Sequence, residues 1–301
     1  MPEVPPYPPF ELMNRVLSLP EDDGSAELAY EFFGSSTSES LRNMLPAGYD
    51  FTGRSVLDFG CGAGRTLRHF LDEAETADFH GVDIDGPSVD WLRKNLCPPL
   101  HVSRSGTEPP LEFEDDKFDF AWAISVFTHL ADSSPAWLLE LHRVLKPGGL
   151  LMASFMVEWN SEAIAGEPWD PDRIGMNVLR HDQHWDDGGP MVLMSEWWMR
   201  EHWGRAFEIA NIDQRVHNQT WVLLRKKDVS ITVEELMEPS SDPREWRAVR
   251  HNIEQLRREI EGNVGGNGRM NAAETRNHYE NTLSWRITAP LRSAKRLIGG
   301  R

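Results

Sequence analysis

Between residues 55 and 155, short apolar segments alternate with amphipathic helical patterns, and this alternation constrains the fold more than any other feature of the chain. Strands separated by helices pair in parallel, and their crossovers are right-handed. The predicted strands are 55–59, 79–84, 100–103, 118–125 and 150–155, and the predicted helices are 66–75, 87–96 and 135–145. The sequence therefore predicts an α/β domain with helices on both faces of a parallel sheet. Two further apolar segments, 208–214 and 220–225, are expected to close the sheet as an antiparallel hairpin.

The first 49 residues precede this alternation and are predicted to form an N-terminal lead-in and lid segment. Residues 1–20 are rich in proline and are expected to be extended and poorly ordered. Residues 25–45 look partly helical, with an interruption at Gly34–Ser36. The apolar anchors expected in this segment are Leu28, Phe32 and Phe33.

The α/β domain is predicted over residues 50–227 and is followed by two segments of different composition. Residues 228–261 are predicted as a helical extension, because apolar residues recur there at heptad spacings. The residues of this seam are Trp246, Val249, Ile253, Leu256 and Ile260. A seam this short predicts a short coiled coil, and self-association through residues 243–261 is one expectation. Residues 262–301 are predicted as a Gly/Asn linker and a basic amphipathic tail.

Charge is distributed unevenly along the chain. The sequence holds 48 acidic and 31 basic residues, for a formal net charge of −17. Residues 285–301 hold five bases and no acid, so the rest of the chain carries −22. This acidic body argues against a nucleic-acid partner, because phosphate neutralisation needs Lys and Arg. Two cysteines cannot make a disulfide framework, and neither a membrane-spanning run nor a signal peptide is recognisable, so a cytoplasmic location is predicted.

A glycine-rich turn follows the first predicted strand. From Val56 the sequence reads VLDFGCGAGR, which places glycines at 60, 62 and 64. Free amides at the start of the next helix would suit a closely approaching ligand. A dinucleotide-binding turn has similar logic but carries its third glycine where this chain has Arg65. The Asp58 carboxylate would repel a pyrophosphate and suits a ligand that carries an ammonium group.

An acidic residue stands at the end of the second predicted strand. Asp83 follows Gly64 by nineteen residues, a position from which a carboxylate accepts hydrogen bonds from ribose hydroxyls. The alternative is that Asp83 or Asp85 only caps the next helix, and for Asp85 both interpretations stay open. The turn and Asp83 together indicate a ligand that contains a ribose.

Four stretches resemble, in the same order, the motifs of class I S-adenosylmethionine-dependent methyltransferases. They are DFGCGAGR at 58–65, GVDID at 81–85, FDFAWAISVFTHL at 118–130 and LHRVLKPGGLLMASF at 141–155. The resemblance is strong over residues 50–155 and weak over 190–227. It implies a Rossmann-like, doubly wound, mostly parallel seven-stranded sheet with a C-terminal antiparallel hairpin, and S-adenosyl-L-methionine as the cofactor.

The resemblance also implies which residues bind that cofactor. They are Asp58, Gly60, Cys61, Gly62, Gly64, Arg65, Asp83, Ile84, Thr107 and Ser125. The glycines would bring backbone against the methionine part, Asp58 would contact its amino group and Asp83 would bind the ribose hydroxyls. Ser125 and Val126 would lie under the sulfonium and the acceptor.

Two positions of this set leave alternatives. Arg65 either faces the cofactor carboxylate or is a surface residue in the first helical turn. Thr107 stands where the family often has an acid that contacts the adenine amino group. The adenine is therefore expected to be bound by backbone alone, by Ser105 or by Thr107.

Methyl transfer to a hydroxyl needs a positioned acceptor and a base. His129 follows the fourth predicted strand and His184 lies in the irregular stretch 158–200, and both are predicted as catalytic bases, with His181 as a further candidate. The alternatives are a loop-holding role for His129 and simple surface polarity for the other two. The histidines and acids at 181–187 match no established zinc spacing, so no metal is predicted. The tryptophans of this stretch are expected in core or lid packing, or stacked on the acceptor.

The end of the chain resembles a short terminal motif of bacterial cell-surface polysaccharide glycosyltransferases and of methyltransferases attached to them. The stretch is WRITAPLR at 285–292. Ile287, Leu291, Ala294 and Ile298 recur at helical spacing among the bases. Residues 283–301 are thus expected to lie on an anionic membrane surface or to dock on a biosynthetic complex, with a disordered basic tail as the alternative.

The sequence as a whole predicts a cytoplasmic S-adenosylmethionine-dependent methyltransferase, located at the inner face of the cell membrane if its tail binds there. Its expected acceptor is a hydroxyl of a small molecule or glycan. Two alternatives stay open: a nicotinamide-dependent oxidoreductase on a similar fold, and a catalytically silent methyltransferase-fold scaffold. Arg65 in place of a third glycine disfavours the first, and intact cofactor motifs disfavour the second.

Overall fold

The computed structural model describes residues 5–17, 24–166, 168–181, 183–184 and 189–265. The chain divides into two compact units. The first, here called the sheet unit, comprises the residues up to Val126, Glu140–Ser154 and Phe207–Asp228. The second, the insert unit, comprises Phe127–Leu139, Phe155–Ala206 and the residues from Val229 onward.

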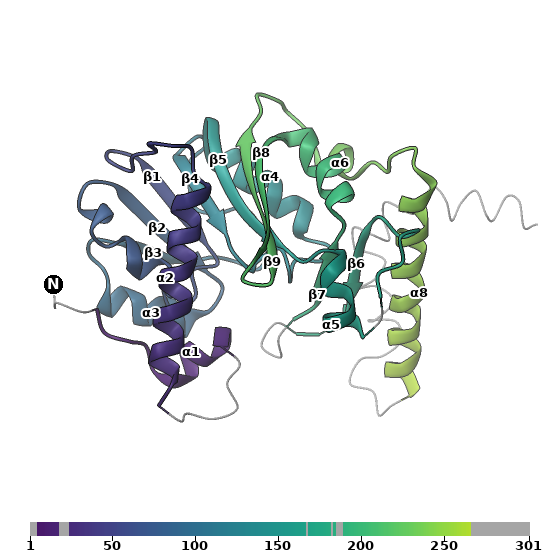
Figure 1. Ribbon diagram of the computed structural model, residues 1–301, viewed down its shortest axis with the longest axis horizontal. Coiled ribbons are helices and arrows are strands. Elements are labelled where there is room, and N and C mark those ends of the chain that lie inside the picture. The colour runs from purple at the N-terminus through teal and green to yellow at the C-terminus, as the bar shows by residue number, and fades with distance from the viewer. Residues whose placement is uncertain (1–4, 18–23, 167, 182, 185–188, 266–301) are drawn as a thin grey trace, which may run out of the picture. The chain divides into compact units, whose positions relative to one another are not determined.

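A seven-stranded sheet is the centre of the sheet unit (Figure 1). Its strands are β1 (Ser55–Phe59), β2 (Asp78–Asp83), β3 (His101–Arg104), β4 (Phe118–Ala123), β5 (Leu145–Phe155), β8 (Phe207–Val216) and β9 (Gln219–Lys226). They lie in the order β3-β2-β1-β4-β5-β9-β8. The first five are joined by parallel pairings, whereas β8 and β9 are antiparallel. The predicted mostly parallel sheet with a closing hairpin is confirmed.

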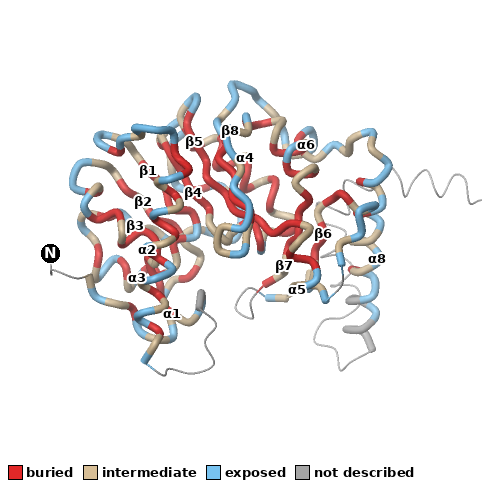
Figure 2. Tube along the Cα trace, in the orientation of Figure 1, coloured by how far each residue is buried: buried red, intermediate tan, exposed pale blue. Residues whose placement is uncertain are grey.

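The two central strands β1 and β4 are buried on both faces (Figure 2). Helices cover both faces of a parallel sheet, so its strands are apolar along their whole length rather than alternating. Val56 and Leu57 are fully buried, as are Phe118 and Phe120 of β4. The core therefore fixes the carboxyl ends of both strands, which carry the glycine-rich turn and Ser125.

Helix α2 (Ala26–Met44) differs from its sequence-based prediction in two ways. It runs without a break, so the predicted interruption at Gly34–Ser36 is wrong. Gly34 is needed inside the helix, because a Cβ atom there would lie 2.2 Å from the carbonyl oxygen of Arg65. The predicted anchors Leu28, Phe32 and Phe33 are exposed. The buried face of the helix consists instead of Ala26, Tyr30, Gly34, Thr37, Ser38, Leu41 and Met44.

Three further segments of the sheet unit depart from expectation. The proline-rich lead-in contains a helix, α1 (Phe10–Leu17). The predicted helix 66–75 is two 3₁₀ helices, η1 (Leu67–Phe70) and η2 (Glu73–Glu75). The Pro147–Gly149 turn, predicted to separate a helix from a strand, lies inside β5. Helix α3 (Gly86–Asn95) agrees with its prediction.

The insert unit supplies most of the elements that sequence patterns left irregular. Its elements are η3 (Glu158–Asn160), α5 (Ser161–Ala165), β6 (Met176–Leu179), β7 (Met191–Met194), α6 (Glu196–Ala206), α7 (Val233–Met237) and α8 (Pro243–Gly265). Helix α4 (Ser134–Val144) begins in the insert unit and ends in the sheet unit. β6 and β7 form an antiparallel two-stranded sheet, which the sequence did not predict. Trp198 and Trp203 of α6 are buried, in line with core packing.

Helix α8 begins inside the predicted helical extension and continues to Gly265, beyond the predicted end of that segment. It packs on β6 within its own unit. Ala248 is fully buried where a Cβ on Gly175 would meet its side chain. The Asn252 side-chain amide accepts the Val178 N–H and donates to the Met176 carbonyl, so it pairs with the backbone of β6. Self-association through this helix stays a prediction, and the predicted basic tail from residue 266 lies outside the described residues.

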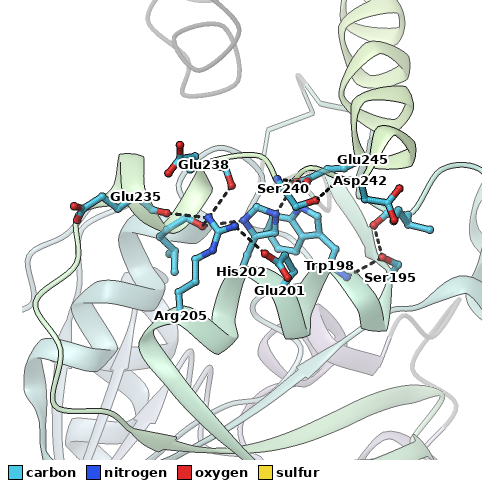
Figure 3. A network of polar contacts seen from close by, with 12 residues as sticks. Ser195, Trp198, Glu201, His202, Arg205, Glu235, Glu238, Ser240, Asp242 and Glu245 are labelled. Atoms are coloured by element: carbon cyan, nitrogen blue, oxygen red, sulfur yellow. Dashed lines mark hydrogen bonds and ion pairs between the residues drawn. The ribbon is translucent and has the colours of Figure 1, made fainter.

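A buried polar network joins α6 to the segments before and within α8 (Figure 3). His202 contacts the Leu236 carbonyl through Nδ1 at 2.8 Å and the Glu245 carboxylate through Nε2 at 2.5 Å. Both partners present acceptor oxygens, so each ring nitrogen of His202 has a hydrogen-bond partner. The second Glu245 oxygen accepts the Ser240 N–H at 2.7 Å. Both side chains of this ion pair are buried, which makes it a specific internal clamp.

Candidate functional site

The glycine-rich turn after β1 adopts a backbone that only glycine accommodates readily. Gly60, Gly62 and Gly64 have φ values of 84°, 51° and 81°, in the left-handed region. A Cβ on Gly60 would lie 2.4 Å from the Val126 side chain, and one on Gly64 would lie 2.5 Å from Leu92. All three glycines are therefore favoured by their positive φ values, and two of them, Gly60 and Gly64, are also required by close packing.

The amides of this turn are bonded within the protein, contrary to the expectation of free amides at a helix start. The N–H groups of Gly60 and Cys61 both donate to the Val82 carbonyl, at 2.8 and 3.0 Å. The Gly62 N–H donates to Asp83 Oδ2 at 2.7 Å. The segment after the turn begins as 3₁₀ helix rather than α-helix. The turn is therefore held in shape by β2, and its inner surface is set before a ligand arrives.

Asp83 lies at the carboxyl end of β2 and connects two loops. Its Oδ2 accepts the Gly62 N–H, and its Oδ1 accepts the Asp85 N–H at 2.8 Å. Burial raises the pKa of this carboxyl, and the two amide hydrogen bonds oppose that shift. Each carboxylate oxygen keeps a second lone pair for a ribose hydroxyl. The arrangement fits the predicted ribose-binding role.

The neighbouring Asp85 has a different role, which settles the alternative left open by the sequence. Its side chain accepts the Ser88 N–H at 3.1 Å and so caps helix α3. It also forms an ion pair with Arg15 of α1 at 3.2 Å. Ile84 lies between the two acids, and its carbonyl accepts the Arg104 Nε–H at 3.0 Å. Ile84 is thus fixed through its backbone at the predicted site.

Asp58 is a buried carboxylate at the end of β1. It is 4% exposed. Burial raises its pKa well above the ordinary value, and the nearby Asp83 acts in the same direction, while Trp122 and Arg65 oppose the shift. A buried carboxylate without a full counter-charge is stabilised by a cationic ligand. This electrostatic situation fits an ammonium group at the predicted position.

Arg65 and Cys61 are separated by three residues but face different surroundings. The Arg65 guanidinium is largely enclosed, and burial lowers its pKa while Tyr30 and Asp58 act to raise it. Its predicted contact with the cofactor carboxylate stays a prediction, and the charges of Tyr30 and Asp58 act on it from the side of the turn. The Cys61 side chain belongs to the hydrophobic core, with the pKa of its thiol raised by burial. Cys61 can thus contribute to a cofactor site through its backbone only.

Ser125, just past β4, has an unusual backbone for a residue with a side chain. Its φ of 60° lies in the left-handed region, which costs energy and often marks a functional position. Its N–H donates to Ser154 Oγ at 2.7 Å, and its own Oγ accepts a hydrogen bond from Gln219 Nε2 at 2.9 Å. Gln219, the first residue of β9, was not predicted. Its pairing with Ser125 depends on the strand order, which no local pattern revealed.

The segment after β3 reaches Asp83 through its backbone. The Ser105 N–H donates to the Asp83 carbonyl at 2.9 Å. Thr107, two residues later, is exposed in a turn. Adenine contact by either residue stays a prediction, and the tie between Ser105 and Asp83 keeps this segment at the ribose end of the site.

The predicted bases all lie in the insert unit. His129 Nδ1 lies 3.0 Å from the Pro190 carbonyl oxygen, and burial lowers the pKa of its imidazole. His184 is exposed, and its carbonyl accepts the Gly189 N–H at 3.0 Å. His181 Nε2 lies 3.4 Å from Asp132 Oδ2. The structure thus gives His129 and His181 defined partners within their unit.

In the ranges given above, no group of three or more His, Cys, Asp or Glu side chains is arranged to hold a metal ion. Part of the acidic stretch considered for metal binding, residues 182 and 185–188, lies outside those ranges. No helix of the described part of the chain is long and apolar enough to cross a membrane.

Comparison with known proteins finds a family match for part of the chain. Residues 56–149 match the family model of a methyltransferase domain. The chain is 28% identical over 126 residues to phthiotriol/phenolphthiotriol dimycocerosates methyltransferase 1 of Mycobacterium ulcerans, a match covering 40% of this chain and 45% of that protein. It is 32% identical over 110 residues to 2-methyl-6-phytyl-1,4-hydroquinone methyltransferase of Synechocystis, covering 36% of this chain and 33% of that protein. The chain thus spans less than half the length of either relative.

A solved structure supports the fold. A chain in the complex between the Haloferax volcanii Trm112 methyltransferase activator and a methyltransferase matches 69% of this chain and 96% of its own length. The TM-score is 0.51 at 18% identity, so the likeness concerns the fold alone. The Rossmann-like sheet, the family match and the glycine, Asp58 and Asp83 geometry all agree with S-adenosylmethionine as the cofactor.

Proposed function

We propose that this chain, whose residues 56–149 match the family model of a methyltransferase domain, is a class I S-adenosylmethionine-dependent methyltransferase that transfers a methyl group to a hydroxyl of a small-molecule or glycan acceptor. The observation that carries the proposal is the site at the carboxyl ends of β1 and β2. A preformed glycine turn, a buried Asp58 and an Asp83 with free lone pairs match a ligand with a ribose and an ammonium group.

The residues of the sheet unit bind and orient the cofactor in this proposal. Asp83 accepts the ribose hydroxyls, and Asp58 attracts the ammonium group of the methionine end. Bound S-adenosylmethionine supplies an electrophilic methyl group on a sulfonium. Because transfer is an in-line displacement, the main contribution of the protein is to hold the acceptor at about 3 Å and in line. Ser125 is held by hydrogen bonds with Ser154 and Gln219, and the side chain of the next residue, Val126, lies against Gly60 of the turn.

His129 is the proposed general base. The Pro190 carbonyl can only accept, so His129 Nδ1 carries the proton and Nε2 is an unprotonated acceptor. Burial lowers the pKa of the imidazole, with the nearby Arg180 acting in the same direction, so this form predominates at neutral pH. Chain connectivity keeps His129 within about 11 Å of Val126, since three residues span no more than that. A hydroxyl acceptor can then lose its proton to Nε2.

His184 is the second proposed base. It is exposed, so it would act on an acceptor that is itself bound at the surface of the insert unit. His181 Nε2 lies 3.4 Å from Asp132 Oδ2, so this carboxylate can orient the imidazole. Separate His129, His184 and His181 variants therefore rank the three by their effect on the rate of methyl transfer.

The acceptor class rests on charge and on the relatives. A net charge of −22 outside the basic C-terminal segment disfavours a nucleic-acid acceptor. The two relatives are named for methyl transfer to phthiotriol dimycocerosates and to a phytyl hydroquinone, which are small molecules. Screening of sugars, nucleotide sugars and small hydroxylated molecules with labelled S-adenosylmethionine identifies the acceptor.

Calorimetry with S-adenosylhomocysteine tests the proposal. The full chain is expected to bind this product, and Asp83→Ala should weaken binding by at least tenfold. NADH serves as the competing ligand for the oxidoreductase alternative, and it is expected not to bind. Absence of S-adenosylhomocysteine binding at millimolar concentration would reject the proposal. Binding without methyl transfer to any acceptor would favour the scaffold alternative.

The C-terminal segment is a separate proposal. Residues 283–301 combine five bases with apolar residues at helical spacing, which suits an anionic membrane surface. The full chain should cosediment at low salt with vesicles containing an anionic lipid, and a chain ending at Gly265 should not. Equal behaviour of the two chains would contradict membrane attachment through this segment. A concentration series by analytical ultracentrifugation tests self-association through residues 243–261.

A further inference from the structure

Tyr30 lies on the buried face of α2. Its side chain is fully buried, and its ring packs against Met13 of α1 and Ala26 of its own helix. Tyr30 precedes Gly34 by one helical turn, so the two residues lie on the same face. Gly34 abuts the Arg65 carbonyl at the end of the glycine-rich turn. The helix face that carries Tyr30 therefore lies against that turn.

The Tyr30 hydroxyl is a buried polar group without a hydrogen-bond partner among the described residues. Buried hydroxyls are normally bonded, so an orphan needs an explanation. The groups that act electrostatically on this phenol are Arg65, Arg68, Cys61 and Asp58. Three of these four belong to the segment from Asp58 to Arg65. The hydroxyl thus lies within electrostatic range of the turn that is predicted to hold the methionine end of the cofactor.

The two arginines near this hydroxyl differ in how far their donors are already used. Arg68 donates to the Pro5 and Pro6 carbonyls at 2.6 and 3.2 Å, and its Nε lies 3.8 Å from Glu31. Arg65 makes no hydrogen bond or ion pair with the described residues, although it is largely enclosed. Arg65 and Tyr30 are therefore two enclosed donors without acceptors, close to each other and to Asp58.

We propose that the Tyr30 hydroxyl and the Arg65 guanidinium together bind the α-carboxylate of the cofactor's methionine end. This assignment rests on the proposed function and adds a residue from α2, outside the motifs of the turn. A carboxylate offers about four acceptor positions, enough for both donors. The Asp58 carboxylate would bind the ammonium group of the same amino-acid end. The three residues then form a site for a zwitterion.

Burial supports the donor role of Tyr30. It raises the pKa of the phenol, so the hydroxyl keeps its proton throughout the physiological range. Hydrogen bonds to a charged acceptor are stronger than neutral ones, and they gain further in an enclosed site. The unpaired hydroxyl of Tyr30 destabilises the ligand-free protein, and a hydrogen bond to the bound ligand removes this destabilisation.

Tyr30→Phe tests the assignment with two ligands. S-adenosylhomocysteine carries the α-carboxylate, and 5′-methylthioadenosine has the same nucleoside but no amino-acid end. Loss of a hydrogen bond to the carboxylate should weaken S-adenosylhomocysteine binding by about tenfold. Binding of 5′-methylthioadenosine should not change. The melting temperature of the free variant should stay equal or rise, because an orphan hydroxyl has been removed.

Tyr49→Phe is a matched control. Its hydroxyl is also buried without a hydrogen-bond partner among the described residues, but Arg54 and Asp119, not the turn, act on it. Both ligands should bind this variant as they bind the unchanged protein. Arg65→Gln should show the same ligand selectivity as Tyr30→Phe, so a folding defect in one variant does not end the test.

The outcomes separate this inference from the proposed function. If the unchanged protein binds neither ligand, the proposed function fails and the inference fails with it. If it binds S-adenosylhomocysteine but Tyr30→Phe binds that ligand equally well, only the inference is overturned. An equal loss for both ligands would also overturn it, since a contact with the carboxylate cannot affect a ligand that lacks one.

Discussion

Gly34→Ala examines how closely α2 approaches the glycine-rich turn. Alanine in place of glycine ordinarily stabilises a helix interior by about 1 kcal/mol. Here the new Cβ would lie 2.2 Å from the Arg65 carbonyl oxygen and 2.6 Å from His69 Nε2. Ordinary non-bonded contacts are about 3.5 Å, so the helix and the turn would have to separate by roughly 1 Å.

The expected result is a net loss of stability. Overpacking of a tight interior costs about 1–3 kcal/mol. The upper end applies here, because the nearest atom to the Gly34 Cβ belongs to the backbone and cannot rotate away. After the alanine gain, the free energy of unfolding should fall by about 2 kcal/mol. For a domain of this size the melting temperature should fall by about 4–8 °C, measurable by scanning calorimetry of the full chain.

Gly204→Ala in α6 is the control. No atom lies within 4 Å of the Cβ that this substitution adds. The helix-propensity gain should therefore appear undiminished, as a rise of about 2–4 °C in the melting transition of the insert unit. A rise of the same size for Gly34→Ala would refute the close approach of α2 to Arg65. It would also weaken the placement of Tyr30, which lies on the same helix face.

Three further predictions concern the ionisable groups Asp58, Glu245 and His129. Burial raises the pKa of Asp58, so its contribution to stability is present below the unfolded pKa and is lost as pH rises through the folded pKa. Asp58→Asn should remove this decline in urea unfolding measured from pH 4 to 8, and an unchanged pH dependence would contradict it. Burial acts to raise the pKa of Glu245, but the hydrogen bond and charge of His202 outweigh it and lower the pKa. The pair therefore stabilises the fold above the unfolded pKa of Glu245, and this stabilisation is lost as pH falls through the folded pKa. Glu245→Gln removes the ion-pair partner of His202 and should lower the free energy of unfolding by about 3–5 kcal/mol, measured by urea unfolding. The control Glu201→Gln, at a partly exposed pair with Arg205, should lower it by under about 1 kcal/mol. Similar losses for the two variants would contradict a special role of the buried His202–Glu245 pair. His129→Asn should lower the methyl-transfer rate by about 10²–10⁴-fold and remove the fall in rate at acidic pH, and an unchanged rate and pH profile would assign His129 a structural role.

Sequence patterns were informative wherever one segment carries the whole signal. The apolar runs of β1 and β4 are long enough to identify buried strands, and the glycines after β1 are required by a backbone that no other residue adopts easily. Asp83 could be predicted because its distance from the turn follows from one crossover. Each of these features depends on the conformation of one short segment, so the residues of that segment are enough to predict it.

The parts that escaped prediction depend on contacts between distant segments. α2 appeared anchored by Leu28, Phe32 and Phe33, but its buried face is selected by the space beside Arg65, which admits Gly34 and excludes larger side chains. Tyr30 carries no motif, and its relation to Asp58 arises only when α2 packs on the turn. Apolar character alone could not separate the buried from the exposed face of this helix.

The hydrogen bond between Ser125 and Gln219 has a consequence for the order in which the protein is built. The two residues are 94 positions apart, and β9, which begins at Gln219, lies between β5 and β8 in the sheet. At a synthesis rate of about 5–20 residues per second, Ser125 waits roughly 5–20 s for its partner. Once they have been synthesised, β5 is an open edge and β8 has no neighbour in the sheet until β9 is inserted. Cofactor binding by a ribosome-bound chain would therefore report the insertion of β9, the step that completes the sheet.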